Sequence, residues 1–256
     1  MSDDLRLLVK FIQAPPDSEL SKQITRYSNN QNGVRARDFK SNHEIQIRLQ
    51  NEIKIHYGSE YFYEIKRGEG ASGLISISNE TAGQYLMAYD LKEPSATHRK
   101  YQIFEDKYNE LFARPAVSAD RVIFLQTIAS VIESKKSEIN NQLFARYALS
   151  TFFLMYTLRL AFESDGSASD LLEHSEHSIA DPALRENLQR AIGEILSELI
   201  TDLNAELDTL GGDFDYRGKL RDAEWSKKMA GELVATRKKL VDRGRLPRLA
   251  EIMRSN

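Results

Sequence analysis

The sequence contains no cysteine, and this absence excludes several kinds of protein at once. Without cysteine there is no disulfide-stabilised scaffold, no zinc site built on thiolates and no cysteine nucleophile. Histidine is scarce as well, and the five residues leave little room for a histidine-rich metal site. Long hydrophobic runs are also lacking: the most apolar stretch, residues 147–158, is far shorter than the roughly 20 residues that a membrane-spanning helix needs. We therefore expect a buried core helix there and no membrane partner.

The N-terminus has no signal-peptide pattern. Residues 1–4 include two acidic side chains, with no basic region followed by an apolar stretch. Together with the absence of cysteine, this pattern leads us to expect a cytoplasmic protein.

The charge of the chain is nearly balanced overall but strongly patterned along its length. The formal net charge is −3, which argues against a uniformly basic protein that coats nucleic acid. Residues 22–67 nevertheless carry a net charge of +4, residues 163–215 carry −12, and residues 217–254 carry +7. One interpretation is that acidic and basic helices pair with each other, within one chain or between the copies of a homo-oligomer. The other is that a basic segment binds phosphates.

The hydrophobic periodicity predicts a fold of the α+β class that is predominantly α-helical. We expect strands at 7–12, 61–66 and 74–77, and helices at 17–32, 41–57, from 79 onward, 119–135, 140–163, 182–210 and 219–242. Ser41 and Glu44 have the spacing of a capping box, and Phe104, Tyr108 and Phe112 have helical spacing. Arg114-Pro115 is the best candidate boundary between a small N-terminal α+β unit, residues 1–115, and a C-terminal helical bundle, residues 116–256.

The most distinctive candidate binding segment is a run of four amides flanked by arginines. Carboxamides are good turn formers and offer both donors and acceptors, and guanidinium groups suit phosphates. Its members are Arg26, Asn29, Asn30, Gln31, Asn32, Arg35 and Arg37. The structural alternative is a capping turn that locks two helices together.

Several motifs in this part of the chain follow one another in a recognisable order. The passage Tyr27-Ser28-Asn29-Asn30-Gln31-Asn32 precedes Asp38-Phe39 and Ser41-Asn42; Gln46 and Leu49 follow, then Tyr61-Phe62-Tyr63-Glu64-Ile65-Lys66-Arg67-Gly68, and then Gln84, Ala88, Pro94, Phe104, Tyr108 and Phe112. Over residues 5–115 this order resembles the bacterial abortive infection phage resistance (AIPR) family. Beyond about residue 120 we find only a shared helical character.

The resemblance implies an anti-phage defence protein. Members of the family usually carry an upstream nuclease-like domain, so we expect this chain to correspond to the C-terminal portion of that architecture. It would then be a natural short form, the second product of a split gene or a truncated form. An upstream nuclease-like protein or domain is accordingly an expected partner, and nucleic acid is another.

A second set of residues raises the alternative of catalysis. Glu64-Ile65-Lys66 matches the second half of a nuclease signature in which a carboxylate holds Mg²⁺ and a lysine orients the attacking water. The signature also needs an acidic ligand upstream; the only upstream Pro-Asp is Pro16-Asp17, which a helix-capping role explains well. In the structural alternative, Glu64 and Lys66 share one strand face and point to solvent.

Two further groups of residues are weaker candidates. His174 and His177 have a spacing that would let one helical turn chelate a metal, but they lie in an acidic, serine-rich stretch. The C-terminal basic residues could instead contact several phosphates without sequence preference. They are Arg237, Lys238, Lys239, Arg243, Arg245 and Arg248.

The sequence therefore predicts a non-catalytic module, without a cofactor, that binds nucleic acid or a protein partner. The expected contact residues are the amide segment and its arginines, together with Lys66 and Arg67. A Mg²⁺-dependent nuclease and a purely structural oligomerisation module remain the alternatives.

Overall fold

The computed structural model describes Pro15, Ser18, Arg37 and residues 40–164, 179–211 and 214–254. The predicted strand at 7–12, the predicted helix at 17–32 and the amide segment lie outside the described residues, except for Arg37. His174 and His177 also lie outside them.

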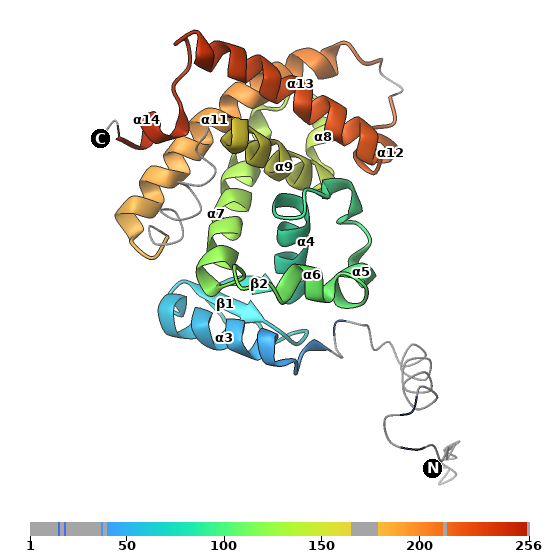
Figure 1. Ribbon diagram of the computed structural model, residues 1–256, viewed down its shortest axis with the longest axis vertical. Coiled ribbons are helices and arrows are strands. Elements are labelled where there is room, and N and C mark those ends of the chain that lie inside the picture. Colours follow the sequence, from blue (N-terminus) through green and yellow to red (C-terminus); the bar gives the residue numbers. More distant parts are fainter. Residues whose placement is uncertain are drawn as a thin grey trace, which may run out of the picture.

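The described elements run in chain order as a helix, two strands and a series of helices (Figure 1). They are α3 (Glu44–Tyr57), β1 (Tyr61–Glu64), β2 (Ile75–Ser78), α4 (Asn79–Tyr89), the 3₁₀ turn η1 (Pro94–Ala96), α5 (Lys100–Phe104), α6 (Tyr108–Phe112), α7 (Ala119–Lys135), the 3₁₀ turn η2 (Lys136–Glu138), α8 (Gln142–Ala145), α9 (Ala148–Ser164), α11 (Pro182–Asp208), α12 (Tyr216–Leu220), α13 (Ala223–Asp242) and α14 (Leu249–Arg254). The predicted class, predominantly helical α+β, is confirmed.

A small parallel sheet and α3 form one end of the molecule (Figure 1). Tyr61 of β1 lies opposite Ile75 of β2. The predicted stripe of α3 is confirmed, because Leu49 and Ile53 are fully buried. The capping-box prediction is wrong: α3 begins after His43, whose Nδ1 accepts a hydrogen bond from the Ile45 amide at 3.4 Å. The cause is a turn before the helix, in which the His43 amide donates to the Lys40 carbonyl at 3.0 Å.

The centre of the molecule is built on α4, α7 and α9. The apolar window that could not span a membrane is part of α9, which is buried along most of its length. Helix α7 has the predicted bounds, and Ser118 caps it by accepting a hydrogen bond from the Arg121 amide at 3.1 Å. None of the helices described in the structure combines the length and the apolar character that crossing a bilayer requires.

Three predicted helical segments are each divided in the structure. The segment 140–163 contains α8 and α9, and the segment 219–242 is divided between α12 and α13, where Asp222 caps α13. The spacing from Phe104 to Phe112 belongs to two short helices, because Glu105 has a non-helical backbone with φ −112° and ψ −103°. Hydrophobic spacing identifies the buried face of a helical segment. It does not reveal a break in the helix when the apolar residues on both sides of the break stay on the buried face.

The hydrophobic core is continuous from Leu49 in α3 to Ile252 in α14. Helix α4 packs against α7 and α9, and therefore across the boundary predicted after residue 115. The division into residues 1–115 and 116–256 stays a prediction from the sequence.

Candidate functional site at the end of β1

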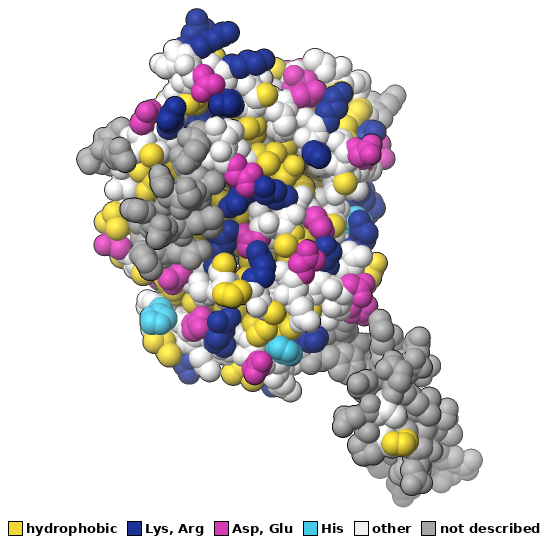
Figure 2. Space-filling view, viewed as in Figure 1, with side chains coloured by type: hydrophobic (Ala, Val, Ile, Leu, Met, Phe, Trp, Pro, Cys, Tyr) yellow, Lys and Arg dark blue, Asp and Glu magenta, His cyan; other side chains and the backbone are white. Residues whose placement is uncertain are grey.

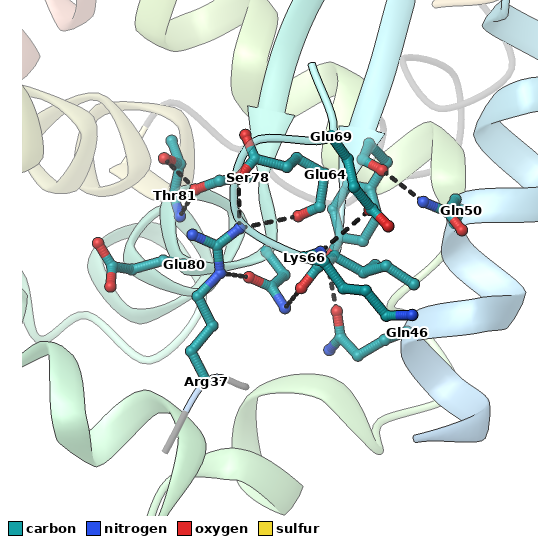
Figure 3. A network of polar contacts seen from close by, with 12 residues as sticks. Arg37, Gln46, Gln50, Glu64, Lys66, Glu69, Ser78, Glu80 and Thr81 are labelled. Carbon is teal, nitrogen blue, oxygen red and sulfur yellow. Dashed lines mark hydrogen bonds and ion pairs between the residues drawn. The ribbon is translucent and has the colours of Figure 1, made fainter. Parts of the chain in front are cut away.

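Arg37 connects the segment that precedes α3 to the end of β1 and the start of α4. Its Nη2 donates to Glu64 Oε1 at 2.9 Å and to the Glu64 carbonyl at 3.2 Å, and its Nε donates to Asn79 Oδ1 at 2.5 Å. Figure 3 shows the Arg37 guanidinium beside the Glu64 side chain. We call Arg37, Glu64 and Asn79 the Arg37 anchor.

The three side chains of the Arg37 anchor are well shielded from water. Asn79 is fully buried, and the side chains of Arg37 and Glu64 are 9% and 19% exposed. Asn79 also donates from Nδ2 to the carbonyl of Ile65 at 3.3 Å, so both ends of its amide are used. A charged pair in such surroundings is held by its mutual hydrogen bonds, and removing either partner leaves a polar group without compensation.

A second polar chain fixes β1 against α3. The Tyr63 hydroxyl donates to Gln46 Oε1 at 2.9 Å, and Gln46 Nε2 donates to the Tyr108 hydroxyl at 3.4 Å. Burial raises the pKa of Tyr63 well above its ordinary value, so this hydroxyl stays a donor throughout the physiological range. One turn further along α3, Gln50 Nε2 donates to the Tyr63 carbonyl at 3.0 Å. Together these contacts hold the strand that leads to Glu64.

The two basic residues expected beside the arginines lie just beyond the Arg37 anchor. Lys66 and Arg67 are exposed in the loop 65–74, which we call the β1 loop. Glu69 Oε2 accepts a hydrogen bond from the Lys66 amide at 3.1 Å. In Figure 3 the Lys66 side chain extends away from the Arg37–Glu64 pair. Gly68, with φ +78°, supplies the left-handed conformation that the turn requires.

A pocket of about 500 Å³ opens between α3, β1 and the β1 loop. Its lining includes the Gln50 and Asn51 amides, the Lys54 ammonium group and the half-buried Phe62 ring. These groups can hydrogen-bond, neutralise and stack against a planar polar ligand.

The structure corrects the interpretation that Glu64 and Lys66 share a solvent-facing strand surface. Strand β1 ends at Glu64, so Lys66 belongs to the β1 loop, and Glu64 is paired with Arg37 rather than solvated. Within the described ranges, no group of three or more histidine, aspartate or glutamate side chains is placed to hold a metal ion.

Arg37 differs from the exposed contact residue that the sequence suggested, because its guanidinium is bound by the protein itself. Two supporting residues, Asn79 and Gln46, were not expected at the site. Asn79 was expected only to begin a helix, and Gln46 was visible only as part of the family motif. The pattern of apolar residues cannot predict the hydrogen-bond partners of these buried amides. Asn79 binds Arg37, and Gln46 binds Tyr63 and Tyr108, and these partners come from distant parts of the chain.

The described fold is mainly helical, and the Arg37 anchor lies at its small sheet-and-helix end. The model of a known family, described as AIPR protein, matches residues 2–207. The chain belongs to this family, and its membership supports a role in anti-phage defence by abortive infection. The match extends well beyond residue 115, where the visible motifs end, so residues 116–207 of the helical region are part of the family as well. No curated protein and no solved structure matches the chain.

Proposed function

We propose that the chain is a non-catalytic module of an abortive-infection system and that it contacts nucleic acid around the end of β1. The contact surface combines the amide segment with Lys66 and Arg67. The observation that supports this most strongly is the Arg37 anchor, since it ties the end of the amide segment to the strand that leads into the β1 loop.

Three of the predicted contact residues, Arg35, Lys66 and Arg67, lie within three residues of a member of the Arg37 anchor in the sequence. Arg35 precedes Arg37 by two residues, and two residues of extended chain span roughly 7 Å. Lys66 and Arg67 follow Glu64 after a single residue, Ile65. Three cationic side chains can in this way serve one stretch of phosphate backbone, while Arg37 acts as their support.

The pocket beside the β1 loop adds a means of contacting a base. Phe62 offers a stacking surface, and Gln50 and Asn51 offer amide donors and acceptors. Lys54 at the same pocket contributes another cation near the phosphates. An unpaired or flexible nucleotide therefore fits the chemistry of this surface better than a purely hydrophobic ligand does.

The test is the binding of fluorescent duplex and single-stranded oligonucleotides by the whole chain, measured by anisotropy at several salt concentrations. Removing three phosphate contacts with the variant R35Q/K66Q/R67Q should reduce the slope of log K against log salt by about 3. The matched control R217Q/K227Q/K228Q changes the same number of charges at exposed sites on α12 and α13. Arg37 is unsuitable for this test because its loss would disturb the fold.

Binding that is salt-insensitive, or that both variants weaken equally, would contradict the proposal. Absence of binding to either form of nucleic acid, combined with capture of an upstream nuclease-like protein, would show that the surface serves a protein partner instead.

A further inference from the structure

The C-terminal end of α13 leads into a tight turn with a well-defined backbone. The Gly244 amide donates to the Val241 carbonyl at 2.9 Å, and the Arg245 amide donates to the Leu240 carbonyl at 2.9 Å. Gly244 has φ +65°, a conformation that residues with a side chain rarely adopt. These bonds close the helix and set the direction in which the chain leaves towards α14.

Two arginines link the end of α13 and α14 to α11. Arg237 is 1% exposed; its Nε contacts Glu198 Oε2 of α11 at 3.1 Å, and its Nη2 donates to the Pro247 carbonyl at 2.9 Å. Arg190 of α11 donates from Nη2 to the Ile252 carbonyl at 3.4 Å. The expected pairing of the acidic and basic segments is therefore seen at Arg237. It does not extend to the basic residues that follow.

Four other cations at this end of the molecule face outward. Lys239, Arg243, Arg245 and Arg248 are exposed, and none of their side chains forms an ion pair with a residue in the described part of the chain. Lys238, by contrast, is paired with Asp242 at 3.2 Å. Glu251 is the other carboxylate at the turn, and its Oε2 accepts from the Arg248 amide at 2.9 Å. We call Lys239, Arg243, Arg245 and Arg248 the cationic turn.

Beside the cationic turn lies a hollow of about 480 Å³, which is lined by Arg245 and Arg248 together with Asp242, Glu251 and the residues around Gly244. In Figure 2, Lys and Arg side chains gather at the top of the molecule, where Figure 1 places the end of α13, with some carboxylates among them. The sheet and the β1 loop lie at the opposite end of the molecule (Figure 1).

We propose that the cationic turn binds the phosphate backbone of duplex nucleic acid, as a second contact surface separate from the β1 loop. This inference deepens the proposed function but rests on different residues. Lys239 lies in the last turn of α13 and Arg243, four residues later, is the residue that ends this helix, while Arg245 and Arg248 border the hollow. Such an arrangement suits adjacent phosphates and carries no sequence information.

Two alternatives fit the observations less well. Single-stranded nucleic acid needs aromatic side chains for stacking, and Trp225, the aromatic residue of α13, is half-buried at the other end of that helix. A second copy of the chain would have to supply acidic groups; Glu198 and Glu194 of α11 are already paired with Arg237 and Arg190, which leaves residues such as Glu206 and Asp208 at the far end of that helix, and the light-scattering measurement below tests such a contact. The cationic turn also lies beyond residue 207, where the family match ends, so it is a feature of this chain rather than of the matched region.

The experiment uses the whole chain, a fluorescent duplex DNA and the same DNA as single strands, over roughly 50 to 200 mM salt. The variant K239Q/R243Q/R245Q should raise the Kd for the duplex about tenfold or more and lower the salt slope by about 3. The control R217Q/K227Q/K228Q should leave both quantities nearly unchanged. Circular dichroism and light scattering on each variant show whether the fold and the oligomeric state are preserved.

The possible outcomes separate this inference from the function proposed above. If R35Q/K66Q/R67Q weakens binding and K239Q/R243Q/R245Q does not, the cationic turn is overturned while the β1 surface stands. The reverse result supports the cationic turn and contradicts the β1 surface. A salt-sensitive oligomer that K239Q/R243Q/R245Q dissociates, with no duplex binding, would overturn the inference in favour of self-association.

Discussion

Arg37 and Glu64 form an ion pair with 2.9 Å between Nη2 and Oε1, and it joins two segments that lie 27 residues apart in the chain. The same guanidinium also binds Asn79 at the start of α4. One side chain thus fixes the approach to α3, the end of β1 and the beginning of α4. Two of the motifs that resemble the family coincide with this pair in the sequence, because Asp38-Phe39 follows Arg37 and Glu64 lies within residues 61–68.

Replacing Arg37 should destabilise the protein rather than only weaken a contact. In R37A, the Glu64 carboxylate and the Asn79 amide lose their partner in a poorly solvated place, which should cost about 2–4 kcal/mol of unfolding free energy. Urea unfolding followed by circular dichroism measures the loss. K66A is the control, because Lys66 is exposed and its change should stay within about 0.5 kcal/mol. Equal stability of R37A and K66A would show that the anchor contributes nothing.

The sequence predicts the periodic elements of this fold well. The spacing of apolar residues locates α7 with its actual bounds, finds both strands and identifies α9 as a buried helix. The breaks between α5 and α6 and between α12 and α13 escape prediction, because they depend on local backbone geometry and on caps such as Asp222.

The candidate site is less predictable than the fold. An arginine beside a run of amides suggests a phosphate contact, but the sequence does not tell whether its guanidinium is exposed or buried. The structure shows that Glu64 and Asn79 bind Arg37. Similarly, the net charges of +7 and −12 do not tell which cations point inward. In the structure Arg237 is buried against Glu198, while Arg243 and Arg245 remain at the surface.

The ion pair between Arg37 and Glu64 bears on the nuclease alternative. A Mg²⁺ ion at Glu64 would have to share the carboxylate with the Arg37 guanidinium, whose positive charge opposes a second cation, so we expect no Mg²⁺-dependent cleavage by this chain. The measurement is the cutting of labelled duplex and single strands with Mg²⁺ or with a chelator. Cleavage that requires Mg²⁺ and disappears in K66A would establish the alternative. K228A would serve as its control, since Lys228 is equally exposed but lies on α13.

Asp90 should be among the most sensitive positions for stability. Its side chain is 4% exposed and accepts hydrogen bonds from Arg114, at 2.7 Å, and from Arg121, whose side chain is also 4% exposed. D90A leaves the Arg121 charge buried without its counter-ion, so we expect a loss of about 3–5 kcal/mol in urea unfolding. The more exposed pair between Lys107 and Glu93 provides the comparison, and E93A should cost at most about 1 kcal/mol. Similar losses in the two variants would contradict this difference.

Alkaline conditions should destabilise the protein through Tyr89. Burial raises the pKa of Tyr89 to about 12 from the ordinary value of 10.0, although Arg121 and Arg159 lower it in part. Because the folded state has the higher pKa, its stabilisation of the neutral phenol is complete below pH 10 and is lost as the pH rises towards 12. Two units correspond to roughly 2–3 kcal/mol.

The variant Y89F isolates this contribution, because it keeps the ring in contact with Phe124 and removes the ionisable hydroxyl. Unfolding free energies measured by urea titration between about pH 8 and pH 12 should fall more steeply for the natural protein than for Y89F. Tyr85, whose pKa burial also raises to about 12, should leave part of the slope in Y89F, and Y85F/Y89F should reduce it further. Parallel curves for all three proteins would mean that neither phenol is held neutral by the fold.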